Sequence, residues 1–322
     1  MSGASTGKGG TLCLTGGVGG AKLVLGLYRA LPPEELVVAI NTGDDFTHWG
    51  LEIWPDFDTT LYVLSGLSDY VRGWGRVDET WECLKAMGAL GGETWFQLGD
   101  RDLSTHITRT NALRAGLTPG EVGQRLAAAL GIETQLVPAA ETPIRTIVET
   151  PDGDLAFQDY FVRLRAEPRV TGLRYEGVGE ARPSAPLAEA LADPDLRGVI
   201  LAPSNPLLST PPVLEIAGVR AALAGLKAPV VAVTPIIGGA AVKGPSAKIM
   251  AELGLEVTPV AVARLYRDFL DGFVIDETDA HMADEVRALG LECHVAQTLM
   301  RTEDDKIALA RETLAFVDRL AG

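Results

Sequence analysis

The chain has 322 residues, 47% of them hydrophobic and 22% charged, so it can bury the core of one large domain or of two modest ones. Its formal net charge of −15 argues against a broad surface for nucleic acid or anionic membrane, because such surfaces need clustered Lys and Arg. Three widely spaced cysteines predict neither a disulfide framework nor a zinc site, and no apolar run approaches the length of a membrane span.

We therefore expect a cytoplasmic protein that binds neither nucleic acid nor membrane. Residues 1–10 are polar and rich in glycine, and we expect them to form a flexible segment. The chain shows no internal repeat, low-complexity segment or long linker. A single α/β domain over 11–322 is the organisation that this pattern favours.

A short apolar strand over 11–15 is followed by a glycine turn and then by an amphipathic helix that runs to Ala30. Backbone N–H groups at the start of such a helix can bind an anion, and glycines let the anion approach closely. The alternative is a glycine-rich turn that only packs closely. The turn and the helix start contain Gly16, Gly17, Gly19, Gly20 and Lys22.

This glycine turn fits neither of the two common phosphate loops. Lys22 stands where a dinucleotide fingerprint counted from Gly17 needs its third glycine, and no glycine directly precedes Lys22 as the P-loop requires. The next predicted strand, 36–41, ends in Asn41 rather than in the Asp or Glu that holds a ribose in NAD enzymes. The pattern therefore argues against a dehydrogenase.

Two pairs of aspartates follow the second strand. Asp44 and Asp45 come directly after it, and Asp56 and Asp58 precede an apolar helix predicted over 61–67. Four carboxylates near one phosphate site would repel the phosphate unless a divalent cation lay between them, and Mg²⁺ uses one or two carboxylates together with phosphate oxygens. Ordinary use of aspartate in loops and N-caps is the alternative for each pair.

Arg101 lies between Asp100 and Asp102, with His106 a few residues further along a predicted helix. An arginine framed by two aspartates can form a surface salt-bridge cluster, or it can position a polar substrate to which His106 could donate. Both interpretations remain open at this stage.

The middle of the chain predicts a β-rich insertion over about 133–176. A capped helix over 118–130 precedes it. Strand-like runs follow at 134–137, 146–150 and 155–163, and a Pro-Asp-Gly-Asp turn at 151–154 predicts a hairpin between the last two.

Three further buried strands, predicted over 198–202, 229–234 and 272–275, alternate with helical segments. This alternation predicts a Rossmann-like, mostly parallel sheet with helices on both faces. Ligands in such folds bind at the carboxyl ends of the strands. The loops at those ends offer further donors: Ser204, Asn205, Thr234 and Lys243.

Several of these segments, in this order, resemble the 2-phospho-L-lactate transferases, and the resemblance spans nearly the whole chain. The matching runs are GGVGGAK (16–22), NTGDD (41–45), PDFDT (55–59), RGWG (72–75), LGDRDL (98–103), FQDY (157–160), PSNP (203–206), PIIGG (235–239), FLDGFVIDE (269–277) and TLM (298–300).

The resemblance implies an enzyme of coenzyme F(420) biosynthesis. It would transfer a phosphorylated three-carbon acid from a guanosine diphosphate-linked donor to a ribityl hydroxyl of the deazaflavin Fo, with release of GMP. The sequence leaves lactyl, enolpyruvyl and glyceryl acids open. A homodimer is compatible with the family. A related branch of the superfamily, regulatory proteins that bind UDP-sugars without turnover, is the alternative, and the 72–75 and 98–103 runs favour the transferases.

The resemblance also implies roles for individual residues. Mg²⁺ and the attacking hydroxyl would lie among Asp44, Asp45, Asp56 and Asp58, and Arg101 would contact the deazaflavin or a phosphate; which aspartate acts as the base stays open. The guanosine diphosphate part would be held by Gly16, Gly17, Gly19, Gly20, Lys22, Ser204, Asn205, Thr234 and Lys243.

Overall fold

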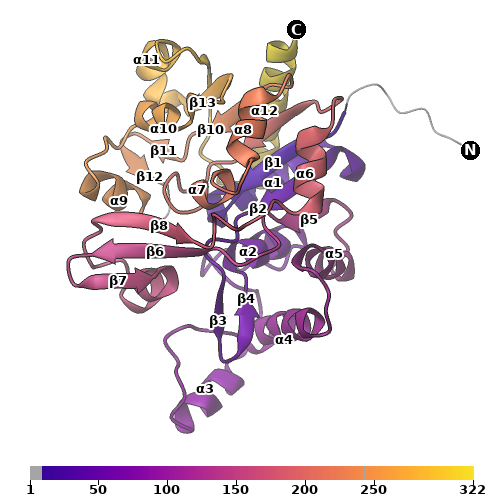
Figure 1. The fold of residues 1–322 in the computed structure, drawn as a ribbon, viewed down its shortest axis with the longest axis vertical. Helices are drawn as coiled ribbons and strands as arrows, with labels where there is room; N and C mark the ends of the chain where they lie inside the picture. The colour runs from indigo at the N-terminus through magenta and orange to yellow at the C-terminus, as the bar shows by residue number, and fades with distance from the viewer. Residues whose placement is uncertain (1–8, 243) are drawn as a thin grey trace, which may run out of the picture.

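A parallel sheet of seven strands forms the centre of the computed structural model, which describes residues 9–242 and 244–322 (Figure 1). Each neighbouring pair of strands is parallel. In spatial order the strands are β14 (Glu292–Ala296), β13 (Gly272–Asp276), β10 (Val230–Val233), β9 (Gly198–Leu201), β1 (Thr11–Thr15), β2 (Leu36–Ile40) and β5 (Gln135–Pro138).

The strands are apolar on both sides because helices cover both faces of the sheet. Along β1, Leu12 and Leu14 pack into one hydrophobic core, and Cys13 between them packs into the other. Successive residues of a strand point to opposite faces, so one continuous apolar run supplies both cores. The predicted Rossmann-like α/β fold is confirmed.

The helices divide between these two cores. Those packed with Cys13 are α1 (Gly17–Ala30), α2 (Pro55–Leu64), α4 (Asp100–Arg114), α5 (Pro119–Ala129) and α12 (Glu303–Ala321). Those packed with Leu12 are α6 (Ala185–Ala192), α7 (Pro211–Leu214), α8 (Val219–Gly225), α9 (Ser246–Glu252), α10 (Pro259–Tyr266) and α11 (Ala283–Arg287). Short helical turns at Pro33–Glu35 and Glu277–Met282 complete the connections. Among the described residues, no helix has the length and apolar character needed to cross a membrane.

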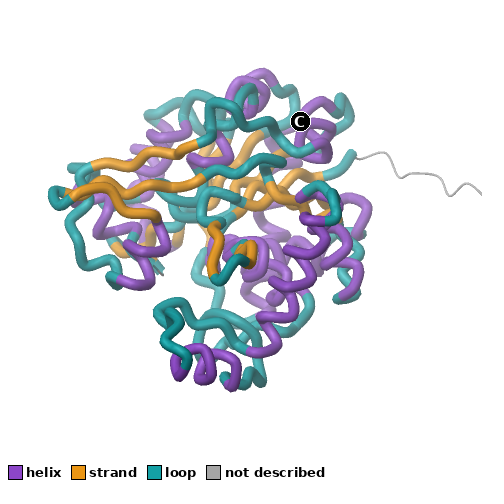
Figure 2. Tube along the Cα trace, turned by 60° about the horizontal axis from the view of Figure 1, so that its bottom comes forward, coloured by secondary structure: helices purple, strands orange, loops and turns teal. Residues whose placement is uncertain are grey.

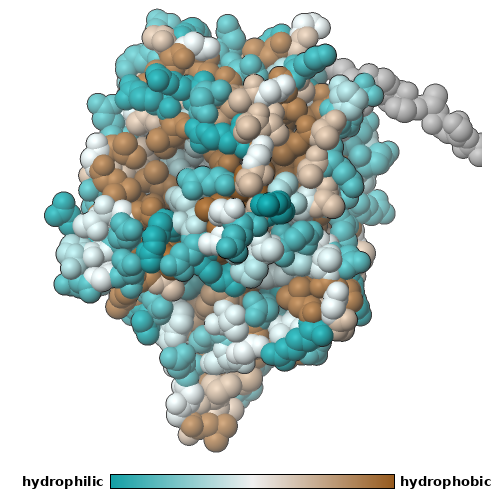
Figure 3. All heavy atoms as spheres, viewed as in Figure 1, coloured by the Kyte–Doolittle hydropathy of each residue, from teal (hydrophilic) through white to brown (hydrophobic). Residues whose placement is uncertain are grey.

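The helix α3 (Glu82–Ala89) buries none of its residues and stands at the tip of a projection (Figures 1 and 2). Leu90, which follows it, is exposed, and the lower tip of the molecule is hydrophobic in Figure 3.

The order of the strands reverses between β1 and β9. The chain first builds outward from β1 through β2 to β5, then returns to β9 on the other side of β1 and continues through β10 and β13 to β14. The loops that follow β1 and β9 therefore flank the point of reversal, where sheets of this kind bind their ligands.

Three small sheets flank the central one. They are the hairpin of β3 (Phe46–His48) and β4 (Leu51–Ile53), the antiparallel sheet of β6 (Arg145–Thr150), β7 (Gly153–Ala156) and β8 (Gly172–Glu176), and the pair β11 (Ile236–Ile237) and β12 (Ala240–Ala241). The predicted β-rich insertion is thus present, but it begins at β6, because the strand predicted near 134–137 joins the central sheet as β5.

Two local predictions were wrong. The strand predicted over 155–163 ends at Ala156, and Asp159–Arg163 forms a helical turn of the π type. Its helical spacing is visible in the stacking of Phe157 on Phe161 and in the ion pair between Asp159 and Arg163 at 3.0 Å. The helix predicted over 61–67 begins earlier, at Pro55, so Asp56 and Asp58 lie in its first turn, where the helix dipole favours acidic residues.

Candidate active site

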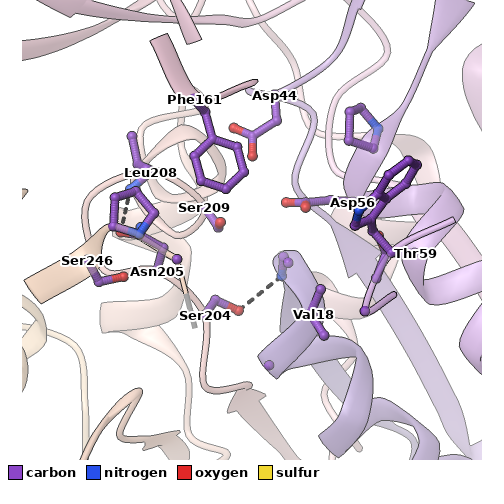
Figure 4. Close-up of a pocket in the computed structure, with 18 of the residues that line it drawn as sticks. Val18, Asp44, Asp56, Thr59, Phe161, Ser204, Asn205, Leu208, Ser209 and Ser246 are labelled. Atoms are coloured by element: carbon purple, nitrogen blue, oxygen red, sulfur yellow. Dashed lines mark hydrogen bonds between the residues drawn. The ribbon is translucent and has the colours of Figure 1, made fainter. Parts of the chain in front are cut away.

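A cavity of about 720 Å³ opens at the carboxyl ends of β1, β9 and β10, beside the strand reversal (Figure 4). We call it the main cavity. Its wall combines the start of α1, the start of α2, the loops after β9 and β10, and a group of aromatic side chains. It is lined by, among others, Gly16, Gly17, Gly19, Lys22, Asp44, Asp56, Asp58, Ser204, Asn205 and Thr234.

The glycine turn lies at the edge of this cavity and also packs closely. Gly17 has a φ of +68°, which favours glycine. A Cβ atom at Gly16 would lie 2.7 Å from Asp56 Oδ2, and one at Gly19 would lie 2.6 Å from the carbonyl oxygen of Pro203. A Cβ at Gly20, which is buried, would collide with the hydroxyl of Thr15. The two interpretations of the turn are therefore compatible, since the turn lines a cavity and excludes side chains for packing reasons as well.

Gly16, the N-cap residue of α1, has no side chain to cap the helix, and the Asp56 carboxylate accepts the N–H of Gly17 in the first turn. The N–H of Gly16, just before it, donates to the hydroxyl of Ser204 at 3.0 Å and ties the loop after β1 to the loop after β9. Figure 4 shows this bond at the base of the cavity.

The other predicted donors are held by the protein itself. Lys22 Nζ donates to the carbonyl of Met300 at 3.1 Å. The side-chain oxygen of Asn205 accepts the N–H groups of Leu207 and Leu208, and the Thr234 hydroxyl bonds to the backbone of Ile236. Lys243 lies outside the described residues.

Asp44 and Asp56 face the main cavity as a buried pair (Figure 4). Asp56 Oδ2 accepts the side-chain amide of Asn41 at 2.9 Å. Burial raises the pKa of Asp56 to about 6, and burial together with the charges of Asp56 and Asp45 raises the pKa of Asp44 well above its ordinary value. Two carboxylates in such a place repel each other, and among the described residues no basic side chain is seen to offset their charge.

The remaining two aspartates are placed differently. Asp45 lines a second cavity rather than the main one, and Asp58 forms a buried ion pair with Arg109. Within residues 9–242 and 244–322, no three or more His, Cys, Asp or Glu side chains are arranged to hold a metal ion. The structure thus does not assemble the four aspartates into one metal-binding group. Within the described part of the chain, Asp44 and Asp56 are the pair that faces the cavity without an ion pair to a basic side chain.

A polar network extends behind Asp58. Arg109 is fully buried; its Nη1 donates to Asp58 Oδ2 at 3.0 Å and to the carbonyl of Glu52 at 3.1 Å, its Nη2 pairs with Asp58 Oδ1, and the guanidinium lies over the ring of Trp54. Arg109 Nη1 also lies 3.1 Å from His106 Nδ1. Because an arginine nitrogen can only donate, His106 Nδ1 must accept, which leaves the proton of a neutral ring on Nε2.

His106 Nε2 lies 3.3 Å from Asp102 Oδ2, and the Tyr62 hydroxyl donates to Asp102 Oδ1 at 2.6 Å. Burial opposes the ionisation of Asp102, but the bonds from His106 and Tyr62 outweigh burial and lower the pKa of this carboxyl. Asp58, Tyr62, Asp102 and His106 all line the main cavity, which therefore has a rigid polar end.

Arg101 is not brought into this site. Its side chain is 54% exposed, lies 3.8 Å from Asp78 and lines neither cavity. Of the two interpretations of Arg101 left open from the sequence, a surface salt bridge is the one that matches this position.

Comparison with known protein families identifies the family to which the chain belongs. The chain matches the family model described as 2-phospho-L-lactate transferase CofD over residues 12–313. The chain belongs to the 2-phospho-L-lactate transferase family. The resemblance stated from the sequence motifs is confirmed.

Relatives of this transferase family carry two names. The chain is 40% identical over 301 residues to a 2-phospho-L-lactate transferase of Methanosarcina mazei, covering 93% of this chain and 97% of that one. It is 38% identical over 314 residues to a phosphoenolpyruvate transferase of Streptomyces griseus, covering 95% and 98%. Protein BH3568 of Bacillus halodurans shares the fold with a TM-score of 0.61 at 15% identity, covering 96% of this chain and 99% of that one.

Sequence reasoning missed the buried arginine of this family member. Arg109 lies at the position i+3 from His106 on α4, where both side chains reach the same face of the helix. A signal was available, because an arginine and a histidine on the inner face of a helix need a buried partner. The sequence alone could not identify that partner as Asp58, which lies 51 residues away.

Proposed function

We propose that this protein transfers a phosphorylated three-carbon acid from a guanosine diphosphate-linked donor to a ribityl hydroxyl of the deazaflavin Fo, releasing GMP, in coenzyme F(420) biosynthesis. The observation that carries the proposal is the juxtaposition of a glycine-lined helix start with the buried carboxylates Asp44 and Asp56 in one cavity. Membership of the transferase family supports the reaction class.

The start of α1 is the place for the diphosphate of the donor. Its first turn lines the cavity, and the glycines there carry no side chains that would keep an anion away from the backbone. The loop after β9, joined to it through Ser204 and Gly16, would border the same phosphates. The guanosine would extend toward the loop after β10, where Thr234 lies.

Asp44 and Asp56 fit a divalent cation. Asp44 Oδ1 is buried and has no hydrogen-bond partner among the described residues, and Asp56 faces the same cavity. Two carboxylates with phosphate oxygens and water are a common ligand set of Mg²⁺. Bound there, Mg²⁺ would neutralise charge on the phosphates during transfer.

We propose a different role for Asp58 than for Asp44 and Asp56. Its charge is balanced by Arg109, so we assign it to orienting the acceptor hydroxyl rather than to holding the cation. Arg109 fixes the carboxylate in one position, and His106 holds Arg109 by accepting from its Nη1. Fixed groups align an attacking oxygen with a phosphorus atom better than mobile ones.

The test is to incubate the purified protein with Fo, Mg²⁺ and each guanosine diphosphate-linked acid in turn, and to identify the product by mass spectrometry. We expect Fo to gain the mass of one phospho-acid and GMP to appear in equal amount. Binding of UDP-sugars without any turnover of Fo would overturn the proposal in favour of a regulatory protein.

A further inference from the structure

One face of α4 carries a line of buried polar side chains that ends at Asp58. Asp102, His106 and Arg109 lie four and three residues apart, so their side chains project from the same side of the helix. All three are buried, and Arg109 is fully so. Arg109 contacts the Asp58 carboxylate through both of its Nη atoms. Asp102, at the other end of the line, has no part in the reaction proposed above.

The orientation of Arg109 depends on where the His106 ring carries its proton. Arg109 Nη1 lies 3.1 Å from His106 Nδ1, and a guanidinium nitrogen can only donate. A proton on Nδ1 would set two donors against each other, and the guanidinium would have to turn away from the ring. The contact therefore requires the tautomer that is protonated on Nε2 alone.

Asp102 is placed to select that tautomer. Its Oδ2 lies 3.3 Å from His106 Nε2, and an ionised carboxylate can only accept. Its Oδ1 accepts the Tyr62 hydroxyl at 2.6 Å, and the Tyr62 oxygen lies 2.9 Å from the Thr105 hydroxyl. Because the single proton of Tyr62 goes to Asp102, Thr105 must donate to Tyr62. Asp102 is thus held on its far side and faces the ring with an acceptor.

We propose that Asp102 is a positioning residue for the transfer. It keeps the proton of His106 on Nε2, His106 Nδ1 then accepts from Arg109, and Arg109 presents both Nη atoms to Asp58. The inference rests on the proposed function, because Asp58 is there the group that orients the acceptor hydroxyl. Asp102 acts through His106 and Arg109 rather than by contact with a reacting atom.

The tautomer can be measured without any substrate. The chain has four histidines, and nitrogen-15 NMR of protein labelled in them separates protonated from unprotonated ring nitrogens. The signals missing from His106→Asn assign those of His106. We expect a proton on Nε2 only in the wild type, and a larger share on Nδ1 in Asp102→Asn, whose amide can donate to Nε2. A wild-type ring protonated on Nδ1, or on both nitrogens, would overturn the proposal.

Kinetics test the effect on the reaction. Asp102→Asn keeps size and shape, and we expect it to lower kcat about tenfold or more while KM for Fo and for the donor changes less than about twofold, because a misaligned Asp58 affects the transition state more than binding. A matched acid-to-amide control is Glu79→Gln. The Glu79 carboxylate accepts the N–H groups of Arg101 and Asp102 at 2.8 Å each, at the start of the same helix, and lines neither cavity.

The control should loosen the start of α4 without changing the tautomer of His106, so we expect its kcat to stay within about twofold of the wild type. An equal fall of kcat in Glu79→Gln and Asp102→Asn would attribute the loss to the helix and overturn the positioning role.

A double variant tests whether Asp102 acts through His106. In His106→Asn the amide oxygen can accept from Arg109 as Nδ1 does, and it has no tautomer to be selected. Adding Asp102→Asn should therefore lower kcat by less than about twofold further. A further fall as large as in the wild-type background would overturn the proposal. A wild-type protein with the expected tautomer that does not turn over Fo would instead overturn the proposed function, with the link from Asp102 to Arg109 still supported.

Discussion

Arg109 and Asp58 form a two-point ion pair in the interior of the protein, at the edge of the main cavity. Neither charge could remain there alone, because the energy of bringing an ion out of water is large unless a partner compensates it. Asp58 therefore stabilises the fold around the site through this ion pair, and it also lines the main cavity.

We expect Arg109→Met to lower the free energy of unfolding by about 3–5 kcal/mol, because it leaves the buried carboxylate of Asp58 without a counter-charge. Urea denaturation measures the effect. The double variant Asp58→Asn with Arg109→Met should recover part of the loss. Equal losses in the single and the double variant would show that the lost contacts of Arg109 with Glu52 and Trp54 cause the effect instead.

Asp56→Asn should lower the activity of the protein without lowering its stability. We expect turnover to fall by roughly a hundredfold or more, since the substitution removes one of the two carboxylates that we propose hold the cation against the donor's phosphates. In metal-free buffer the variant should be as stable as the wild type or more so, by about 1 kcal/mol, because a repulsive buried charge disappears. Steady-state kinetics and a thermal melt test this together, and a large loss of stability would indicate a structural role for the carboxylate.

Chelation should abolish transfer. We expect EDTA to stop product formation and added Mg²⁺ to restore it, because Asp44 and Asp56 supply too few ligands to hold a cation without phosphate oxygens. For the same reason the protein alone should bind Mg²⁺ weakly and tighten its hold when GDP is present, which calorimetry can measure. Full activity in metal-free buffer would contradict this.

The glycines of the turn should differ in their tolerance of alanine. Gly19→Ala brings a methyl group against the Pro203 carbonyl, whereas Gly17→Ala meets no atom closer than 3.9 Å and costs only its left-handed backbone, about 1–2 kcal/mol. We expect Gly19→Ala to melt at the lower temperature. The opposite order in a thermal scan would show that the loop moves aside and that packing does not require glycine at position 19.

Asp276 should stabilise the protein in a pH-dependent way. Its carboxylate accepts the N–H groups of Thr278 and Thr298 and the Thr298 hydroxyl, each at 2.9 Å. Burial opposes its ionisation, but these bonds prevail and lower its pKa. A lowered pKa in the folded state gives stability that is present above the unfolded value of about 3.9 and is lost as the pH falls through the folded value.

We therefore expect Asp276→Asn to cost about 1–2 kcal/mol at pH 7 and much less near pH 3, as measured by denaturant unfolding at both pH values. The exposed Asp284→Asn serves as the control and should change stability little at either pH. A cost for Asp276→Asn that does not vary with pH would attribute the effect to packing.

The strands of the sheet could be predicted because buried parallel strands are continuous apolar runs. β1, β2, β9, β10 and β13 all lie within a residue or two of their predicted bounds. β14 escaped prediction because it is an edge strand with Glu292 and His294 in it, so its hydrophobic signal is weak. β5 was predicted as a strand, but its place in the central sheet depends on pairing with β2, about a hundred residues earlier in the chain.

The site was harder to predict than the fold. The loops after β1, β9 and β10, which line the main cavity, could be found because each follows a predicted strand. The division of the aspartates could not, because neighbours in sequence such as Asp44 and Asp45 face different cavities. Spacing along the chain carries no information about which side of a turn each side chain takes.

The contact between α1 and α12 bears on how the protein is made. A Cβ atom at Gly26 of α1 would collide with the carbonyl oxygen of Lys306, so the two helices meet backbone to backbone. Position 26 is translated long before position 306, so α1 leaves the ribosome well before the helix that packs against it. A growing chain would hold the α12-facing side of α1 uncovered until α12 has been made, and the glycine turn at the start of α1 would lack that support until then.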